Sequence, residues 1–188
     1  DVYKRQALPG VNVRIVDPDG LPCPIDGVGQ VHVKGPNVFS GYLGLPQQTA
    51  EAFTQDGWFI TGDVGRIDAE GYVRLVGRAK DLIITGGFNV YPAEVESHLD
   101  KLEGVVESAV IGVPHADFGE GVMAVVVTHG GRPLDEATLL ASLKITIASY
   151  KVPKRIVFVD ELPRNAMGKV QKNLLRLQHQ HTFTGAPQ

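Results

Sequence analysis

Two neighbouring stretches, Pro92-Ala-Glu-Val-Glu96 and Val105-Val-Glu-Ser-Ala-Val-Ile-Gly-Val113, decide the fold of the second half of the chain. The first opens with proline and carries acidic residues in its first turn, which is typical of a helix start. Val95, Leu99 and Leu102 follow at helical spacing and form one apolar face. The second stretch is a short apolar run that predicts a strand. We therefore expect a new domain to begin here.

The rest of this half continues to alternate between helical and strand-like patterns. The predicted elements are a strand over Val122 to Val127, a helix over Glu136 to Ala148, a strand over Ile156 to Val159 and a closing helix over Gln171 to Leu177. Leu139, Leu143 and Ile147 form the apolar stripe of the longer helix. This pattern favours a small α/β or α+β unit in which helices cover one layer of sheet.

The first half of the chain has the period-two pattern of short β-strands. Val11-Asn-Val-Arg-Ile15 and Val31-His-Val-Lys34 alternate apolar and polar residues, and Asp17-Pro-Asp-Gly20 marks a turn between them. Val64 to Val76 is interpreted as a hairpin. The overall prediction is an α+β chain, with a β-rich part over residues 7–79 and an α/β domain over residues 80–180. Residues 1–6 do not lead into this pattern and are interpreted as an assembly remnant.

Composition and charge limit the classes of function. The 188 residues are 43% hydrophobic and have a formal net charge of −3 with dispersed basic residues, so a core is expected and nucleic-acid binding is not. No apolar run approaches the roughly 20 residues of a membrane span. The lone cysteine, Cys23, lies between two prolines and is interpreted as an unreactive loop thiol. These features favour a cytoplasmic protein.

Four segments containing glycine carry the chemistry. Pro163-Arg-Asn-Ala-Met-Gly-Lys169 ends in Gly-Lys, but Pro163 replaces the first glycine of a P-loop and Val170 replaces its Ser or Thr. No Gly-x-Gly-x-x-Gly supports a dinucleotide site. Read in order, the four segments resemble the last four sequence blocks of the adenylate-forming superfamily; they are Trp58-Phe-Ile-Thr-Gly-Asp63, Gly77-Arg-Ala-Lys-Asp81, Thr85-Gly-Gly-Phe-Asn-Val-Tyr-Pro92 and Pro163-Arg-Asn-Ala-Met-Gly-Lys169.

The resemblance extends from about Pro9 to about Arg176 and is strongest to malonyl-CoA synthetases. It implies an AMP-forming acid–thiol ligase that uses Mg-ATP and coenzyme A to convert a small carboxylic acid, here malonate, into its CoA thioester. It also implies that an N-terminal domain of the same polypeptide, with the acyl pocket and the pyrophosphate-binding loop, is missing upstream. The runs that carry the malonyl resemblance are Gly86-Gly-Phe-Asn-Val-Tyr-Pro92, Gly112-Val-Pro-His-Ala-Asp-Phe-Gly-Glu120 and Met167-Gly-Lys-Val-Gln-Lys-Asn173.

The resemblance assigns three residues near the end of the β-rich part. Asp63 is expected to accept hydrogen bonds from the adenylate ribose hydroxyls, because an ionised carboxylate is only an acceptor; the alternative is a turn aspartate. Arg78 is expected to contact the ribose or the phosphates, and otherwise is a surface arginine. Lys80 occupies the hinge position between the two domains.

Two further assignments fall in the second domain. Gly86 and Gly87 resemble the loop that lines the pantetheine tunnel during thioester formation, while the alternative is an ordinary hairpin turn. Lys169 matches the adenylation lysine, which bridges the carboxylate substrate and the α-phosphate; the alternative is a lysine at a helix start. In the family the small domain rotates about the hinge to present first the lysine and then the glycine loop.

Two other groups of charged or ligand-type residues are interpreted as structural and not as binding sites. A basic cluster of Lys151, Lys154 and Arg155 is interpreted as a solvated face rather than a contact for the CoA 3′-phosphate. His115, Asp117 and Glu120 lack a recognised ligand spacing, so no metal site is expected and magnesium is expected to travel with ATP.

Other functions use the same four blocks. Another acyl- or fatty-acid-CoA ligase, and an adenylation or luciferase-like domain, are the alternatives within the enzyme class. The absence of a carrier-protein segment after Lys169 favours a free-standing CoA ligase. A non-catalytic truncated module is the alternative outside it.

Overall fold

The structure is a computed structural model that describes residues 6–129 and 134–184. The chain divides into two compact units, Asp1–Lys80 and Asp81–Gln188, and each is described by itself. Residues 1–5, most of the stretch interpreted as a remnant, lie outside the described residues. The division falls beside the predicted hinge, but the assignment of residues 7–79 and 80–180 to named domains stays a prediction.

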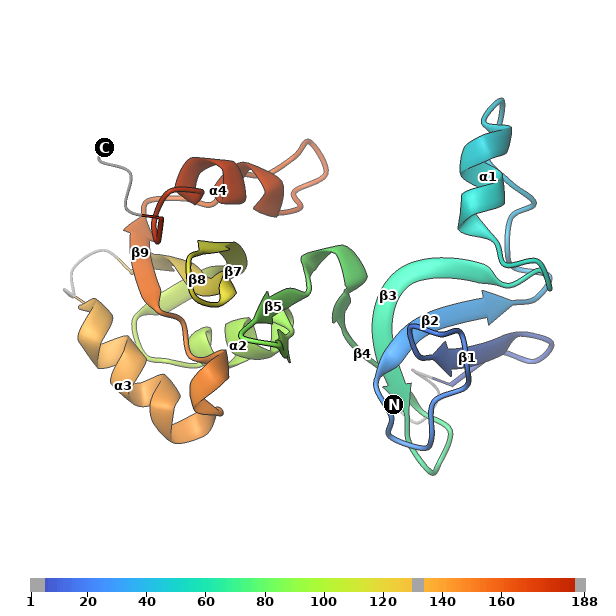
Figure 1. The fold of residues 1–188 in the computed structure, drawn as a ribbon, viewed down its shortest axis with the longest axis horizontal. Helices are drawn as coiled ribbons and strands as arrows, with labels where there is room; N and C mark the ends of the chain where they lie inside the picture. The colour runs from blue at the N-terminus through green and yellow to red at the C-terminus, as the bar shows by residue number, and fades with distance from the viewer. Residues whose placement is uncertain (1–5, 130–133, 185–188) are drawn as a thin grey trace. The chain divides into compact units, whose positions relative to one another are not determined.

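The first unit is a four-stranded antiparallel meander (Figure 1). Its strands are β1 (Asn12–Val16), β2 (Gly29–Lys34), β3 (Phe59–Ile67) and β4 (Val73–Arg78), paired in the order β1-β2-β3-β4. The alternating patterns place Ile15 opposite Val31 in the β1–β2 ladder, and both side chains are buried. The predicted strands and hairpin are therefore confirmed in this unit, although β3 and β4 extend beyond the predicted hairpin.

One helix in the first unit was not predicted. Helix α1 (Pro46–Ala52) begins with proline, the residue best suited to the first helical position, and has only seven residues. It buries none of them. A helix without a buried face leaves no apolar periodicity in the sequence, so the pattern used to find the other helices could not detect it.

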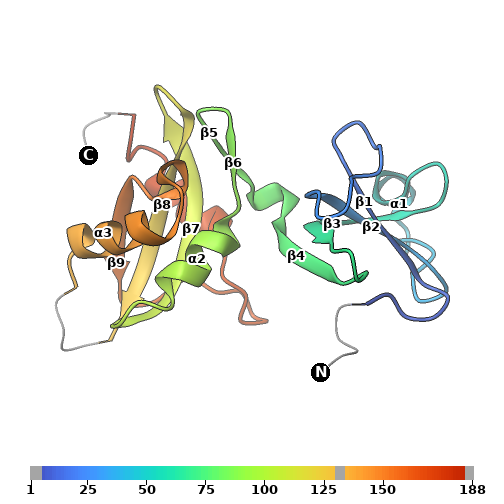
Figure 2. The same cartoon turned by 90° about the horizontal axis from the view of Figure 1, so that it is seen from below.

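The second unit is a five-stranded sheet with helices on its faces (Figure 2). Strands β5 (Ile83–Thr85), β6 (Phe88–Val90), β7 (Val105–His115) and β8 (Gly119–Thr128) follow the order β6-β5-β8-β7, and β9 (Arg155–Val159) pairs with β8 in parallel. The helices are α2 (Pro92–Leu99), α3 (Glu136–Thr146) and α4 (Lys172–His179). Single 3-10 turns cover Ala79–Asp81 and Ser149–Lys151. The predicted α+β class is confirmed.

Both faces of this sheet are buried, which explains the continuous apolar runs of β7 and β8. Alternate residues of β8 enter two separate cores. Val122, Ala124 and Val126 pack with α2 and α3 residues such as Leu99 and Leu143. The intervening residues pack on the other face with Leu162 and with Leu175 of α4; they are Met123, Val125 and Val127.

The observed elements differ from the predicted ones mainly at their ends. Strand β7 continues through Pro114 to His115, because it is an edge strand of the sheet, where a proline is tolerated. Helix α3 ends at Thr146, and Ile147 is extended. No helix within residues 6–129 and 134–184 is long and apolar enough to cross a membrane.

Candidate functional site

Asp63 and Arg78 lie directly opposite each other on β3 and β4. Arg78 Nε donates to Asp63 Oδ1 at 3.0 Å, and Arg78 Nη1 donates to the carbonyl of Thr61 at 3.2 Å. The Thr61 hydroxyl in turn accepts from the Asp63 amide at 3.0 Å. The hairpin therefore presents an ionised carboxylate and a guanidinium as one unit, with the Asp63 side chain one-quarter exposed.

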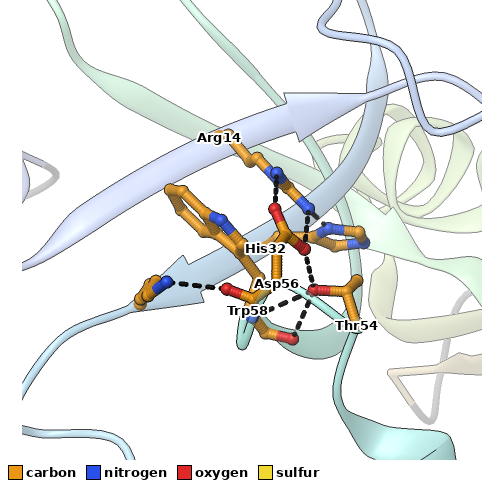
Figure 3. A network of polar contacts seen from close by, with 6 residues as sticks. Arg14, His32, Thr54, Asp56 and Trp58 are labelled. Atoms are coloured by element: carbon orange, nitrogen blue, oxygen red, sulfur yellow. Dashed lines mark hydrogen bonds and ion pairs between the residues drawn. The ribbon is translucent and has the colours of Figure 1, made fainter.

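A polar network fixes the loop that leads into β3 (Figure 3). Arg14 of β1 donates from Nη1 to Asp56 Oδ2 at 2.9 Å and lies over the Trp58 ring, 4.4 Å from its centroid. Thr54 donates to Asp56 Oδ1 at 2.6 Å and accepts from the Trp58 amide at 3.0 Å. Hydrogen bonds from Thr54 and then from Arg14 lower the pKa of Asp56 to about 2. These contacts therefore hold the loop that precedes β3, the strand that carries Asp63.

His32 of β2 completes this network from inside the unit. It is buried, and its Nδ1 accepts from Arg14 Nε at 3.4 Å. Burial, followed by the nearby Arg14 cation, lowers the pKa of His32. A neutral imidazole that accepts at Nδ1 carries its proton on Nε2, and that atom has no hydrogen-bond partner among residues 6–129 and 134–184. His32 therefore supports Arg14 as a neutral acceptor.

Lys80 is exposed within the 3-10 turn Ala79–Asp81, where the two compact units meet in sequence. The next residue, Asp81, belongs to the second unit and accepts from Arg176 Nη2 of α4 at 2.8 Å. This ion pair ties the start of the second unit to its last helix.

Gly86 and Gly87 form the two-residue turn of the β5–β6 hairpin, in which Thr85 pairs with Phe88. Their φ angles are +55° and +82°, both in the left-handed region that favours glycine, as in a type I′ turn. A Cβ on Gly87 would meet no atom within 4 Å, so its surface is open. The two glycines therefore form a hairpin turn, which was the alternative to a ligand loop. The turn also has a bare backbone that a ligand can approach closely.

Lys169 lies in a closed loop between Pro163 and Gln171, not in a helix. Asn165 organises the loop, because its Oδ1 accepts from the amides of Met167 and Lys169, each at 3.0 Å. The Asn165 amide donates to the Lys169 carbonyl at 2.9 Å. The Lys169 side chain itself is exposed. The loop therefore fixes the backbone of Lys169 and leaves its ammonium free to reach a ligand.

Arg164 anchors this loop to the sheet. Its Nη1 donates to the Gly168 carbonyl at 2.7 Å, and its Nη2 is paired with Glu107 near the start of β7. The glycine turn is bound at the other end of the same ladder, where the Gly86 amide donates to the Phe118 carbonyl at 2.9 Å. Glu107 and His115 are eight residue steps apart along β7, or about 26 Å at the usual rise. The Lys169 loop and the glycine turn are thus bound to opposite ends of the β7–β8 ladder.

The three clustered basic residues have different surroundings. Lys151 Nζ binds the Glu94 carboxylate at 2.6 and 2.8 Å, and Arg155 Nη1 binds Glu136 at 3.0 Å. Lys154 Nζ instead lies 3.8 Å from the centroid of the Phe118 ring. The favoured interpretation of a solvated basic face omitted these carboxylates, because the acids lie far away in the sequence.

The residues weighed as metal ligands have structural contacts. Glu120 Oε2 accepts from the Ile84 amide of β5 at 2.8 Å, and His115 Nδ1 accepts from the Asp117 amide at 3.1 Å. Across residues 6–129 and 134–184, no group of three His, Cys, Asp or Glu side chains could hold a metal ion. Burial and then Asp17 raise the pKa of the Cys23 thiol, so its thiolate is disfavoured.

Sequence reasoning missed the residues that hold the site in place. Asn165 and Gly168 are both common in turns, so the spacing Asn-x-x-Gly offered a signal for the closed loop. Arg164, Glu107 and Phe118 offered none, because their contacts join segments that are distant in the sequence.

Comparison with known proteins finds a family match within the second unit. Residues 94–169 match the family model described as "AMP-binding enzyme C-terminal domain". The matched residues begin within α2, include the β7–β8 ladder and end at Lys169, whereas Gly86 and Gly87 lie before them.

Relatives match most of the chain. It is 50% identical over 171 residues, 91% of its length, to the 3-[(3aS,4S,7aS)-7a-methyl-1,5-dioxo-octahydro-1H-inden-4-yl]propanoyl:CoA ligase of Rhodococcus jostii (strain RHA1), and covers 31% of that protein. It is 48% identical to feruloyl-CoA synthase of Amycolatopsis sp over 88% of its length, covering 33% of that protein.

A solved structure shows the same arrangement of elements. The crystal structure of ATP bound MatB from Rhodopseudomonas palustris matches with a TM-score of 0.90 and 57% identity, over 95% of this chain and 36% of that one. The chain therefore spans about a third of the length of the relatives that it matches.

Proposed function

We propose that this chain is the carboxyl-terminal part of an ATP-dependent acyl-CoA synthetase, which converts a carboxylic acid to its acyl-adenylate and then to its CoA thioester. One observation carries the proposal. A single AMP-binding enzyme C-terminal domain and the hairpin before it hold an exposed lysine and an open glycine turn at opposite ends of one ladder. The relatives in the comparison are named as CoA ligases and synthases, which supports this reaction class.

The first half-reaction uses Lys169, Asp63 and Arg78. A carboxylate oxygen of the acid attacks the α-phosphorus of ATP, and the bond to the pyrophosphate oxygen breaks. The Lys169 ammonium stabilises the negative charge that builds up between carboxylate and phosphate. Asp63 accepts from the ribose hydroxyls, for which its Oδ2 is open among the described contacts, while Arg78 holds Oδ1 and donates toward the nucleotide.

The second half-reaction uses Gly86 and Gly87. The CoA sulfur attacks the acyl carbonyl carbon, its proton is released, and the bond to the AMP oxygen breaks. A thioester and AMP result. The pantetheine arm passes beside the glycine turn, where the open face of Gly87 leaves room for it. Lys80 serves as the hinge between the two orientations, and Asp81 is held to α4 beyond it.

Malonate is the proposed acid, with methylmalonate second. This choice rests on the three malonyl-type runs in Gly86–Pro92, Gly112–Glu120 and Met167–Asn173. Relatives named for ferulate and for a bicyclic propanoate share about half of this sequence, so general similarity does not select an acid. The acyl pocket is assigned to an N-terminal domain of the same polypeptide.

Magnesium is assigned to Mg-ATP and not to this chain. Several carboxylates of the described residues already bind a cationic side chain. Asp63 is paired with Arg78, and Glu94 is paired with Lys151. No step is therefore attributed to a metal held by these residues. When bound, the ion neutralises phosphate charge during attack on ATP.

The test measures both half-reactions in a polypeptide that joins this chain to its N-terminal domain. ATP–pyrophosphate exchange and CoA-thioester formation are followed with malonate, methylmalonate, ferulate and octanoate, and kcat/KM is compared. The 188-residue chain alone and the Lys169→Ala polypeptide are the controls. We expect the highest kcat/KM for malonate, and no exchange by the chain alone because the other reactant-positioning groups are absent.

The possible outcomes separate the alternatives. A preference for octanoate or ferulate refutes malonate and leaves the ligase reaction intact. Exchange without thioester formation indicates an adenylation domain, and the absence of both reactions contradicts the proposed function. Exchange by the chain alone above its own Lys169→Ala control contradicts the assignment of the acyl pocket to another domain.

A further inference from the structure

Three aromatic rings form a continuous row from the segment after α4 to the glycine turn. The rings of Phe183 and His115 have centroids 5.2 Å apart with an interplanar angle of 44°. The rings of His115 and Phe118 follow at 4.8 Å and 71°, an edge-to-face contact. We call Phe183, His115 and Phe118 the aromatic row. It connects residues that lie 65 positions apart in sequence.

Phe183 is held in place by the strand beneath it. The segment after α4 returns to the sheet, where Phe183 forms a parallel bridge with His115. A Cβ at Gly121 would lie 2.5 Å from the Phe183 ring, so the glycine leaves the space that the ring occupies. Phe183 also packs against the core formed by Ile111, Met123 and their neighbours. The ring is therefore a fixed support for the end of β7.

The other end of the aromatic row contacts the glycine turn directly. Gly86 donates its amide to the Phe118 carbonyl at 2.9 Å, and a Cβ on Gly86 would lie 3.1 Å from the Phe118 ring. Beside this bond, Thr85 pairs with Gly119 and the Ile84 amide binds Glu120. The position of the β5–β6 hairpin thus depends on the β7–β8 turn.

His115 transmits the support of Phe183 to that turn. Its Nδ1 accepts from the Asp117 amide at 3.1 Å, which fixes the turn backbone immediately before Phe118. Its ring is held between the two phenylalanine rings. Loss of the Phe183 ring removes one side of this packing and leaves a space over Gly121. The turn, and with it the carbonyl that binds Gly86, is then free to move.

We propose that Phe183 is a positioning residue for the thioester-forming half-reaction, acting through His115 and Phe118 on the Gly86–Gly87 turn. The inference rests on the proposed function, because it takes the glycine turn as the passage of the CoA thiol. Phe183 touches no reactant. The adenylation half-reaction uses Lys169, whose loop is bound to Glu107 at the other end of β7, and is therefore independent of the aromatic row.

The test compares Phe183→Ala with Phe183→Tyr in the polypeptide that includes the N-terminal domain. For Phe183→Ala, kcat/KM for CoA should fall roughly three- to tenfold, the range expected for loss of an aromatic pair. ATP–pyrophosphate exchange should keep its wild-type kcat and KM. Phe183→Tyr retains the ring and should restore kcat/KM for CoA. Leu177→Ala is the matched control, because this exposed α4 residue removes apolar surface outside the aromatic row.

His115→Ala provides an independent variant. It should lower kcat/KM for CoA to a similar extent, and the double variant with Phe183→Ala should be no worse than His115→Ala alone. Additive losses, an equal loss of exchange and thioester formation, or a failure of Phe183→Tyr to restore activity would overturn the positioning role.

Gly87→Trp separates this inference from the proposed function. If Gly87→Trp lowers thioester formation while Phe183→Ala does not, only the role of Phe183 is wrong. If Gly87→Trp leaves thioester formation unchanged, the glycine turn is not the CoA passage, so that assignment and the role of Phe183 both fail while the proposed ligase reaction stands.

Discussion

The Lys169 loop and the Gly86–Gly87 hairpin are both short turns on one sheet, yet different forces build them. Side chains close the lysine loop, since Asn165 accepts from two backbone amides and Arg164 ties the loop to Glu107. Backbone pairing and positive φ angles build the glycine hairpin, and Phe118 packs beside it. The lysine loop thus presents an exposed charge, and the hairpin presents a bare surface.

Their placement explains why one domain would need two orientations. The two turns are bound to opposite ends of β7, about 26 Å apart by the usual strand rise. A reaction centre has the size of a few bond lengths, so both turns cannot reach it at once. Rotation at Lys80, just before the Arg176–Asp81 ion pair, is a movement that would bring each in turn.

The largest expected effect comes from removing the charge at the lysine loop. In the polypeptide with its N-terminal domain, Lys169→Ala should lower ATP–pyrophosphate exchange by roughly two to three decades, the usual loss for one positioned electrostatic donor. Lys144→Ala, a change at a solvent-facing lysine in the last turn of α3, should leave exchange unchanged. An exchange rate for Lys169→Ala within a few-fold of wild type would show that the lysine loop has no part in adenylation.

A smaller effect is expected when the loop keeps its lysine but loses its organiser. Asn165→Ala removes the acceptor for the Met167 and Lys169 amides, and each such bond contributes about 1 kcal/mol. Exchange should fall about tenfold, whereas Asn165→Asp, which keeps an acceptor oxygen, should lose much less. Steady-state exchange kinetics distinguish the two variants. Equal losses for alanine and aspartate would mean that the hydrogen bonds do not position Lys169.

The smallest effect tests whether the positive φ angle of Gly87 holds the hairpin in its conformation. Gly87→Ala places a Cβ at φ +82° and should destabilise the hairpin by about 1 kcal/mol, although the added atom meets no neighbour. Gly87→Asn should cost less, because asparagine tolerates the left-handed region. Urea unfolding of the two variants measures the difference. Equal stability of the alanine variant and the wild type would show that the turn relaxes to another conformation.

The sequence predicted elements with strong periodicity and failed where contacts are long-range. The runs at Val105–Val113 and Val122–Val127 predicted β7 and β8, because an apolar sheet interior leaves a continuous pattern. The three-residue strands β5 and β6 are too short for such a pattern, so the hairpin was not predicted, and Gly86 and Gly87 were assigned to a ligand loop through the resemblance.

In the candidate site, too, local motifs were visible in the sequence and long-range contacts were not. Asp63, Arg78 and Lys169 were found through motifs, and the structure places the first two in one ion pair. The partners that hold the motifs were not found, because Glu107 reaches Arg164, and Phe118 reaches Gly86, only after the chain has folded back. The same holds for the basic residues Lys151 and Arg155, because their acidic partners Glu94 and Glu136 were not visible from local sequence.

The most direct test of the division between the two turns is single-turnover thioester formation from supplied malonyl-adenylate and CoA. The account predicts that the Lys169→Ala polypeptide forms the thioester at the wild-type rate, although its adenylation is reduced by roughly two to three decades. Gly87→Trp should show the reverse pattern, with normal adenylation and blocked thioester formation. An equal loss of both half-reactions in Lys169→Ala would contradict the account, because the lysine and the glycine turn would then act in one arrangement.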